Sequence, residues 1–211
     1  MKIAIVDYGV GNLFSVKKAF KYFLKNDDLI ATEEPTDILS ADALVLPGVG
    51  SFESGVEGLK IRGLVEPIKK SAEQGKSILG ICLGAQLLMS HGYEFGVFQG
   101  LDIIKGKVVK FPQSAKKTKI PHIGWNKIYL PKAGNWQGTI LENTSENSDF
   151  YFVHSYILCP ENPENILSLT TYGDYEFCSA IVKDKIYGTQ FHPEKSAQSG
   201  LKIIETFINQ V

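Results

Sequence analysis

A cysteine flanked by two glycines is the residue of this sequence best suited to chemistry. Cys82 lies two positions after Gly80 and two positions before Gly84, between a predicted buried strand over 78–81 and a predicted helix from 83 onward. This spacing is typical of a nucleophile elbow, in which a strand turns sharply into a helix. Glycines let the backbone reverse and a substrate approach, and a helix N-terminus favours a thiolate. Most lone cysteines are small buried apolar residues, so other residues must support this interpretation.

A histidine and a glutamate near the C-terminal end can activate this cysteine. His192 and Glu194 follow the β-prone segment 185–191, and Pro193 between them forbids a continued central strand. Residues two apart on an extended backbone point to the same side. Glu194 can therefore accept the second ring N–H of His192 and fix its tautomer and orientation. A His-x-Glu pair alone is a weak signal, but together with Cys82 it predicts a Cys-His-Glu triad.

Two kinds of segment would position these residues. The first half alternates short apolar strands with helices: strands over 3–6, around 29–31, 43–46 and 78–81, a helix over 13–24 with Asn12 as its N-cap, and helical segments toward 74. The second half changes to strands over 103–111, 125–130, 150–158, 166–172, 177–182 and 185–191, followed by a helix over about 199–209. The stretch 131–148, rich in Gly, Asn and Ser, is predicted to be a surface loop.

Parallel β/α units followed by antiparallel strands predict a three-layer α/β sandwich with a mixed central sheet. We expect one domain over residues 1–211, because this length suffices for one well-buried α/β core. In an open α/β sheet the site lies at the carboxyl ends of the strands, so the loop 48–50 should border the elbow. The loop is either a simple turn or part of an oxyanion hole, in which backbone N–H groups of Val49 and Leu83 stabilise a tetrahedral intermediate.

Composition argues against several classes of function. The formal net charge is −1, with 22 Lys and Arg against 23 Asp and Glu, and no dense basic run suggests a nucleic-acid partner. No segment approaches the length of a membrane span, and the N-terminal apolar run is too short for a signal peptide. The three cysteines form no paired framework and a nucleophilic cysteine needs a reducing compartment, so we expect a cytoplasmic protein. His122 and His154 do not fit a metal-ligand spacing with His192 and are expected to be structural or interface residues.

Together these residues resemble a known enzyme family. The segments 80–86 and 190–194 are similar to the motifs of class I, or triad-type, glutamine amidotransferases, whose fold is flavodoxin-like. Within that superfamily the resemblance is stronger still to the glutaminase subunits of imidazole glycerol phosphate synthases. The segments that carry it are 7–12, 46–50, 121–126, 151–156 and 191–196.

The resemblance implies a substrate and its contacts. The substrate would be L-glutamine, hydrolysed without a metal or other cofactor. The residues that would hold it are Gly48, Gly50, Gln86, Glu94 and the backbone of Ser155 and Tyr156. The acidic Glu94 suits the α-ammonium group of glutamine, and Gln86 lies one helical turn after Cys82. The residues that would border a docking face or an ammonia exit are Asn12, Trp125, Tyr151 and Lys195.

The resemblance also implies a partner. Ammonia would pass through a tunnel to a cyclase subunit with a (β/α)8-barrel fold, in a heterodimer. That pair would make imidazole glycerol phosphate and aminoimidazole carboxamide ribotide in histidine biosynthesis. We expect the acceptor site on another polypeptide, because 211 residues leave no room for an acceptor domain.

Three other interpretations remain open. Ala85 stands where the family commonly has Met, and the stretch 131–148 looks like an insertion. These departures leave room for a paralogous subunit that supplies ammonia for amidation of a surface-polysaccharide sugar. A non-catalytic binding subunit would keep the fold, but the intact triad argues against it. A peptidase or γ-glutamyl hydrolase can use the same elbow, but it would leave the segments 121–126 and 151–156 unexplained.

Overall fold

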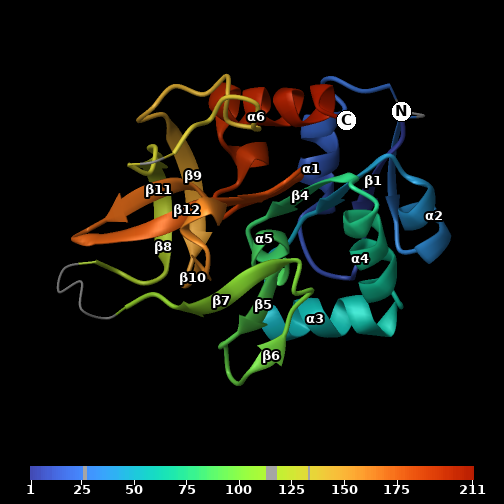
Figure 1. Ribbon diagram of the computed structural model, residues 1–211, viewed down its shortest axis with the longest axis horizontal. Helices are drawn as coiled ribbons and strands as arrows, with labels where there is room; N and C mark the ends of the chain where they lie inside the picture. The colour runs from blue at the N-terminus through green and yellow to red at the C-terminus, as the bar shows by residue number, and fades with distance from the viewer. Residues whose placement is uncertain (26–27, 113–117, 133) are drawn as a thin grey trace.

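A mixed sheet runs through the centre of the molecule. The computed structural model describes residues 1–25, 28–112, 118–132 and 134–211. Within these ranges eleven strands form one sheet in the order β2-β1-β3-β4-β13-β12-β10-β7-β5-β6, with β11 paired to β12 (Figure 1). The strands of the parallel half are β2 (Leu29–Thr32), β1 (Ile3–Val6), β3 (Ala43–Leu46), β4 (Ser77–Ile81) and β13 (Ile186–Thr189). The others are β12 (Tyr175–Lys183), β10 (Tyr156–Pro160), β7 (Ile104–Lys110), β5 (Met89–Gly92), β6 (Phe98–Gln99) and β11 (Ile166–Tyr172).

Helices cover both faces of the parallel half. One face carries α1 (Leu13–Phe20) and α6 (Ala197–Asn209), and the other carries α2 (Pro35–Ser40), α3 (Phe52–Ile61) and α4 (Val65–Glu73) (Figure 1). Alternate residues of a strand point to opposite faces. Ile3 and Ile5 accordingly pack in the core with α1 and α6, whereas Ala4 and Val6 pack in the core with α2, α3 and α4. The predicted three-layer α/β sandwich with a mixed sheet is confirmed.

A separate two-stranded ribbon stands beside the central sheet. It consists of β8 (His122–Lys127) and β9 (Asp149–His154), which pair antiparallel. The single strand expected over 150–158 is therefore wrong, because the chain leaves the ribbon at Ser155 and enters the central sheet as β10. The strand expected over 125–130 is also misplaced: regular pairing ends at Lys127, and beyond it Tyr129 makes only an isolated bridge to Leu169.

Other boundaries differ from the sequence-based expectation by less. The helix expected over 13–24 ends at Phe20, although Asn12 does cap it by accepting the Ser15 N–H at 3.2 Å. The closing helix begins at Ala197, two residues earlier than expected. The sequence pattern also missed the short strands β5 and β6, which come after the short helix that follows the elbow.

The stretch 131–148 is only partly the surface loop that its composition suggests. Its described residues, 131–132 and 134–148, contain no helix or strand. Three apolar side chains in it are nevertheless buried in the core, namely Trp136, Ile140 and Leu141. The Trp136 indole N–H donates to the Leu167 carbonyl at 2.8 Å. These anchors fix the loop against β11, so it forms part of the fold.

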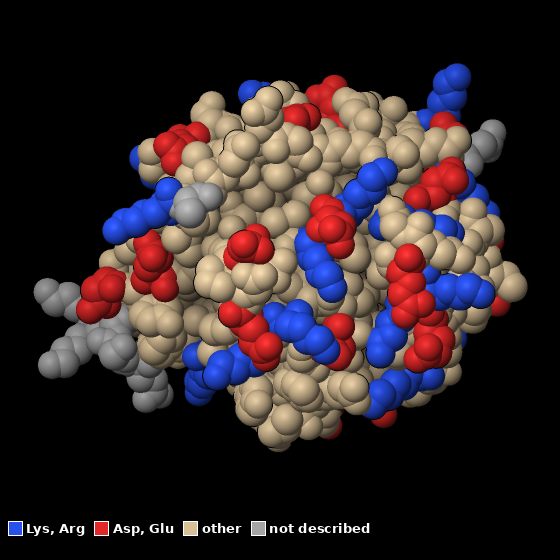
Figure 2. Space-filling model, viewed as in Figure 1, with Lys and Arg blue, Asp and Glu red and all other residues tan. Residues whose placement is uncertain are grey.

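The surface charge and the length of the helices indicate which kinds of partner the molecule can have. Figure 2 shows Lys, Arg, Asp and Glu mixed over the face in view, without a large area of one sign. That face offers no patch of the kind that nucleic acid requires. Among the helices of the described ranges, none combines the length and the apolar character that crossing a bilayer demands.

Candidate active site

The elbow is built as the glycine spacing predicts. β4 ends at Ile81, and the short helix α5 (Leu83–Leu87) begins one residue after Cys82. Cys82 itself has φ +51° and ψ −103°, a conformation that residues with a Cβ rarely adopt. A Cβ on Gly80 would lie 2.7 Å from the Ala85 nitrogen, and one on Gly84 would collide with the Leu46 carbonyl. Both glycines are therefore required for the turn that presents the thiol.

The histidine and the glutamate form a buried pair. His192 Nδ1 lies 2.8 Å from Glu194 Oε1, and the two side chains are only 1% and 2% exposed. The carboxylate accepts the Nδ1 proton, which leaves Nε2 for the nucleophile. Among the described residues, Nε2 has no hydrogen-bond partner. The backbone holds the histidine in place, because its N–H donates to the Tyr151 carbonyl at 2.9 Å and its carbonyl accepts the Ser196 hydroxyl at 2.6 Å.

The charge state of His192 follows from its neighbours. Burial lowers the pKa of His192, but interactions with the Cys82 sulfur and the Glu194 carboxylate outweigh burial and raise this pKa to about 10. The ring is therefore protonated near neutral pH. His192 therefore holds a proton that it can donate to a leaving group.

Cys82 lies at a cavity of about 260 Å³. The thiol is 7% exposed, and its sulfur lies 3.9 Å from the Val153 carbonyl oxygen. The cavity is lined by Val49, Gly50, Cys82, Gln86, Glu94, Pro121, Val153, His154, Ser155 and Tyr156. Five of the six residues expected to hold glutamine, all except Gly48, are among them. This volume suits a small, polar substrate.

Polar contacts fix the cavity wall. The Gln86 amide nitrogen donates to the Tyr156 carbonyl and to Gln190 Oε1, each at 3.3 Å. Glu94 Oε2 accepts the Phe52 N–H at 2.7 Å, at the start of α3.

The loop expected to supply the oxyanion hole lies against the elbow. Gly48 packs on it so closely that an added Cβ would lie 2.7 Å from the Leu83 Cβ. Val49 lines the cavity and is exposed, and Gly50 has φ +128°. The buried Tyr8 hydroxyl donates to the Pro47 carbonyl and so anchors the start of the loop. Burial, with a smaller effect of Cys82, raises the pKa of Tyr8, so it stays a neutral donor.

Three of the four residues expected at a docking face lie together. Trp125 and Tyr151 are cross-strand neighbours in the ribbon, with ring centroids 6.2 Å apart, and Trp125 is 55% exposed. Lys195 Nζ lies 5.9 Å from the centroid of the Tyr151 ring. The centroid of the His192 ring lies 6.5 Å from that of Tyr151. Asn12 belongs to a different segment, where it caps α1. Its neighbour Gly11 approaches the Gly48 backbone, so this segment borders the loop 48–50.

Sequence reasoning included Gln190 in the segment 190–194 but assigned it no role in the site. This buried side chain donates from its amide nitrogen toward Cys82 Sγ at 3.7 Å and links the nucleophile to Gln86. The available signal was its position two residues before His192, which on extended backbone places both on one side. No group of three His, Cys, Asp or Glu side chains in the described ranges is arranged to hold a metal ion.

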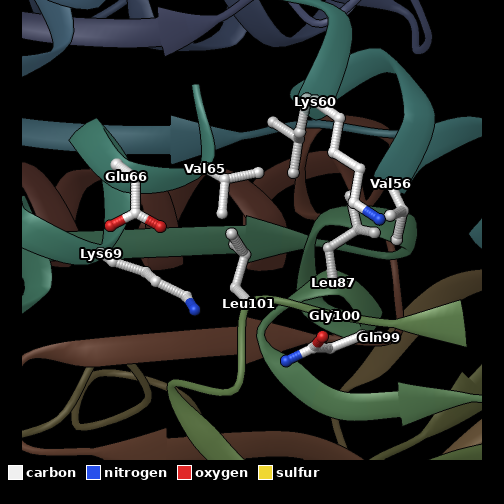
Figure 3. A pocket seen from close by; sticks show the side chains of 10 residues that line it. Val56, Lys60, Val65, Glu66, Lys69, Leu87, Gln99, Gly100 and Leu101 are labelled. Carbon is white, nitrogen blue, oxygen red and sulfur yellow. The ribbon is translucent and has the colours of Figure 1, made fainter. Parts of the chain in front are cut away.

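A second cavity, of about 270 Å³, lies on the other side of α5. Figure 3 shows Val65, Leu101 and Leu87 in the middle of the group, with the Lys60, Glu66 and Lys69 side chains around them. It contains no cysteine, serine or histidine. The ionisable side chains of its lining are Lys60, Glu66 and Lys69.

Comparisons with known proteins agree with this geometry. The family model described as Glutamine amidotransferase class-I matches residues 4–211. Imidazole glycerol phosphate synthase subunit HisH 1 of Legionella pneumophila is 50% identical over 211 residues, covering 98% of each chain. The subunit HisH of Chlorobaculum tepidum is 41% identical and covers 97% of this chain and 98% of its own. A crystal structure of a glutamine amidotransferase superimposes with a TM-score of 0.72 at 15% identity, over 98% of this chain and 97% of its own. At that identity the structural likeness concerns the fold alone.

Proposed function

Because the chain belongs to the class I glutamine amidotransferase family, we propose that it is the glutaminase subunit of an imidazole glycerol phosphate synthase. One observation carries the proposal: a cysteine at positive φ opens onto a cavity beside a buried, protonated histidine that is paired with a glutamate. The chain acts as one domain over residues 1–211, and a free thiol nucleophile suits the reducing cytoplasm.

The first half of the reaction releases ammonia. The Cys82 thiolate bonds to the side-chain carboxamide carbon of glutamine, and negative charge moves to the carboxamide oxygen. Backbone N–H groups of Val49 and Leu83 stabilise that oxygen. His192 gives its Nε2 proton to the nitrogen, the carbon–nitrogen bond breaks, and ammonia leaves. A γ-glutamyl thioester and a neutral His192 remain, and Glu194 keeps the imidazole oriented through Nδ1.

The second half regenerates the enzyme. Neutral His192 takes a proton from water while the water oxygen attacks the thioester carbon. The carbon–sulfur bond breaks, glutamate leaves, and the thiolate and imidazolium are restored. Throughout, the second oxygen of Glu94 pairs with the α-ammonium group of glutamine. Gln86 and the backbone of Ser155 and Tyr156 hold the rest of the substrate.

The ammonia is consumed by a partner subunit. The relatives are named as subunits, which supports a complex, and the partner proposed is a cyclase with a (β/α)8-barrel fold. It docks on the face that contains Trp125, Tyr151 and Lys195, with Asn12 at its edge, and takes ammonia for imidazole glycerol phosphate and aminoimidazole carboxamide ribotide. No metal or other cofactor is required of this subunit. The near-full-length identity to these relatives favours this pathway over amidation of a surface-polysaccharide sugar.

A glutaminase assay with and without the partner tests the proposal. We expect little glutamate formation by the chain alone and strong stimulation by the cyclase subunit with its nucleotide substrate bound. A Cys82→Ala variant in the same complex should be inactive. Stimulation by a sugar-pathway partner, and none by the cyclase, would assign the chain to the other pathway.

A further inference from the structure

Two buried histidines face each other inside the ribbon. His122 on β8 and His154 on β9 are directly opposite in register, and His122 Nδ1 lies 3.1 Å from His154 Nε2. Their residues are only 2% and 6% exposed. Neither belongs to the triad, yet His154 lines the cavity at Cys82. The reaction described above gives neither ring a role.

The position of each proton in this pair follows from one acceptor. The Tyr156 carbonyl lies 2.9 Å from His154 Nδ1 and can only accept, so His154 Nδ1 carries a proton. In a neutral ring His154 Nε2 then accepts, and the proton between the rings belongs to His122 Nδ1. His122 Nε2 is left to accept from the Asn126 amide nitrogen at 3.4 Å. Burial supports two neutral rings, because it lowers the pKa of His122 to about 4 and that of His154 to about 3.

Aromatic packing holds the pair rigidly. The His122 ring stacks between Tyr172, with centroids 3.9 Å apart, and Phe152, at 4.9 Å. The His154 ring packs against Phe177 at 5.2 Å and Phe111 at 6.1 Å. A side chain fixed on both faces can fix in turn the group to which it donates.

The group to which His154 donates, the Tyr156 carbonyl, belongs to the wall of the cavity. The Tyr156 carbonyl accepts from His154 and also from Gln86 Nε2, and Gln86 contacts Gln190, which contacts Cys82 Sγ. Ser155 lies where the chain passes from the ribbon to the central sheet, and its carbonyl accepts the Phe111 N–H at 2.8 Å. The histidine pair adds a side-chain hydrogen bond at Tyr156, the first residue of β10.

We propose that His122 and His154 are positioning residues for glutamine, which act by locking the Ser155–Tyr156 backbone and the Gln86 amide in the orientation that receives the substrate. This inference rests on the proposed function, because it assumes that glutamine occupies the cavity. His154 acts directly on the Tyr156 carbonyl, and His122 acts through His154. The pair sets the KM for glutamine and leaves the bond-breaking steps to the triad.

Two substitutions at one position separate hydrogen bonding from packing. His122→Phe keeps a flat ring between Tyr172 and Phe152 but removes the donor to His154. We expect the KM for glutamine, measured in the complex with the cyclase subunit, to rise about tenfold while kcat stays nearly unchanged. His122→Asn keeps an N–H near the position of Nδ1 and loses the stacking. It should have a nearly native KM and a lower melting temperature.

A matched control and a spectroscopic readout complete the test. His91→Phe, at an exposed position of β5, should change neither KM nor melting temperature. Nitrogen NMR of the imidazole rings should show both His122 and His154 neutral at pH 7 with the proton on Nδ1, whereas free histidine prefers Nε2. A charged ring, an Nε2–H tautomer, or an unchanged KM in His122→Phe would each overturn the inference. A wild-type complex without glutaminase activity would instead refute the proposed function, and the NMR result would remain readable.

Discussion

Two cavities of nearly equal volume flank the short helix α5, and only one of them is equipped for chemistry. The first, of about 260 Å³, contains Cys82 and receives Gln86, whereas the second, of about 270 Å³, receives Leu87. Successive residues on a helix point about 100° apart. Neighbouring positions on α5 therefore point in different directions, and Gln86 lines one cavity while Leu87 lines the other.

The difference between the cavities lies in their polar groups. The first contains a nucleophile at positive φ, a carboxylate and an amide fixed by hydrogen bonds, and backbone groups at a break between strands. The second has an apolar centre, with Lys60, Glu66 and Lys69 around it (Figure 3). The volume of a cavity does not by itself identify a catalytic site. A catalytic site is identified by oriented polar groups that need no reorganisation during the reaction.

Substitution of the nucleophile should have the largest effect on activity of all the changes considered. Cys82→Ala removes the sulfur that bonds to the carboxamide carbon, so glutaminase activity of the complex should fall by at least about 10⁴-fold. Glutamate release with the cyclase subunit bound measures this. The matched control is Cys159→Ala, on β10 away from the cavity lining, which should remain active. Comparable activity in the two variants would remove the basis for distinguishing the cavities.

The carboxylate behind the histidine should give the next largest effect. Glu194→Gln leaves the shape of the pair nearly intact but removes a charge that raises the pKa of His192. We expect kcat to fall by about 10²- to 10⁴-fold. With a lower pKa His192 loses its proton at lower pH, so the alkaline limb of the kcat profile should move toward acid. A shift of that limb toward alkali would contradict the assigned role.

Adjacent residues on α5 provide a direct test of the comparison. Gln86→Ala removes the amide that contacts Tyr156 and Gln190, and the KM for glutamine should rise about tenfold. Leu87→Ala removes a fully buried side chain on the other side, and the free energy of unfolding should fall by about 2–4 kcal/mol. Urea unfolding and steady-state kinetics on both variants check this. A raised KM in Leu87→Ala would mean that the second cavity also serves the substrate.

The buried histidine pair next to the first cavity should make the free energy of unfolding depend on pH. His122 and His154 have pKa values of about 4 and 3, below the ordinary 6.5, so the unfolded chain binds more protons between those limits. Stability should therefore fall as pH drops below about 6.5. Each histidine adds a slope of up to about 1.4 kcal/mol per pH unit. Urea unfolding should be followed from about pH 4.5 to about pH 6.5, a range that lies between the folded and unfolded pKa values. The free energy of unfolding should decline less steeply with falling pH in His122→Phe than in the wild type. The exposed-site control His91→Phe should show the wild-type decline.

The first cavity was partly predictable from the sequence because some of its parts are local. The elbow at Cys82 and the pair of His192 and Glu194 depend on spacings of two residues, and the apolar pattern predicted the parallel half of the sheet. The break at Ser155 was not predictable in this way. The apolar pattern continues through it, and only pairing with β8 on one side and with β7 and β12 on the other separates β9 from β10.

Contacts between distant segments account for most of what the sequence did not reveal. Gln190 acquires its role from a sulfur 108 positions away in the chain, and the His122–His154 bond spans 32 positions. Trp136 was assigned to a surface loop because its neighbours are polar, yet β11 offers it a carbonyl and a buried site. The second cavity has no motif at all, since it is formed where side chains of α3, α4 and α5 fail to fill the space between them.

The charged groups around that second cavity should have the smallest effects. Glu66 is exposed, and Lys69 is only half-buried. Exposed charges contribute little to stability, so Glu66→Gln and Lys69→Gln should each change the free energy of unfolding by less than about 0.5 kcal/mol. The kcat and the KM for glutamine should stay unchanged in the complex, because neither side chain contacts a group that holds the substrate. A clear change in KM from either substitution would show that the two sides of α5 are coupled, and the contrast between the cavities would then have to be explained through movement of this helix.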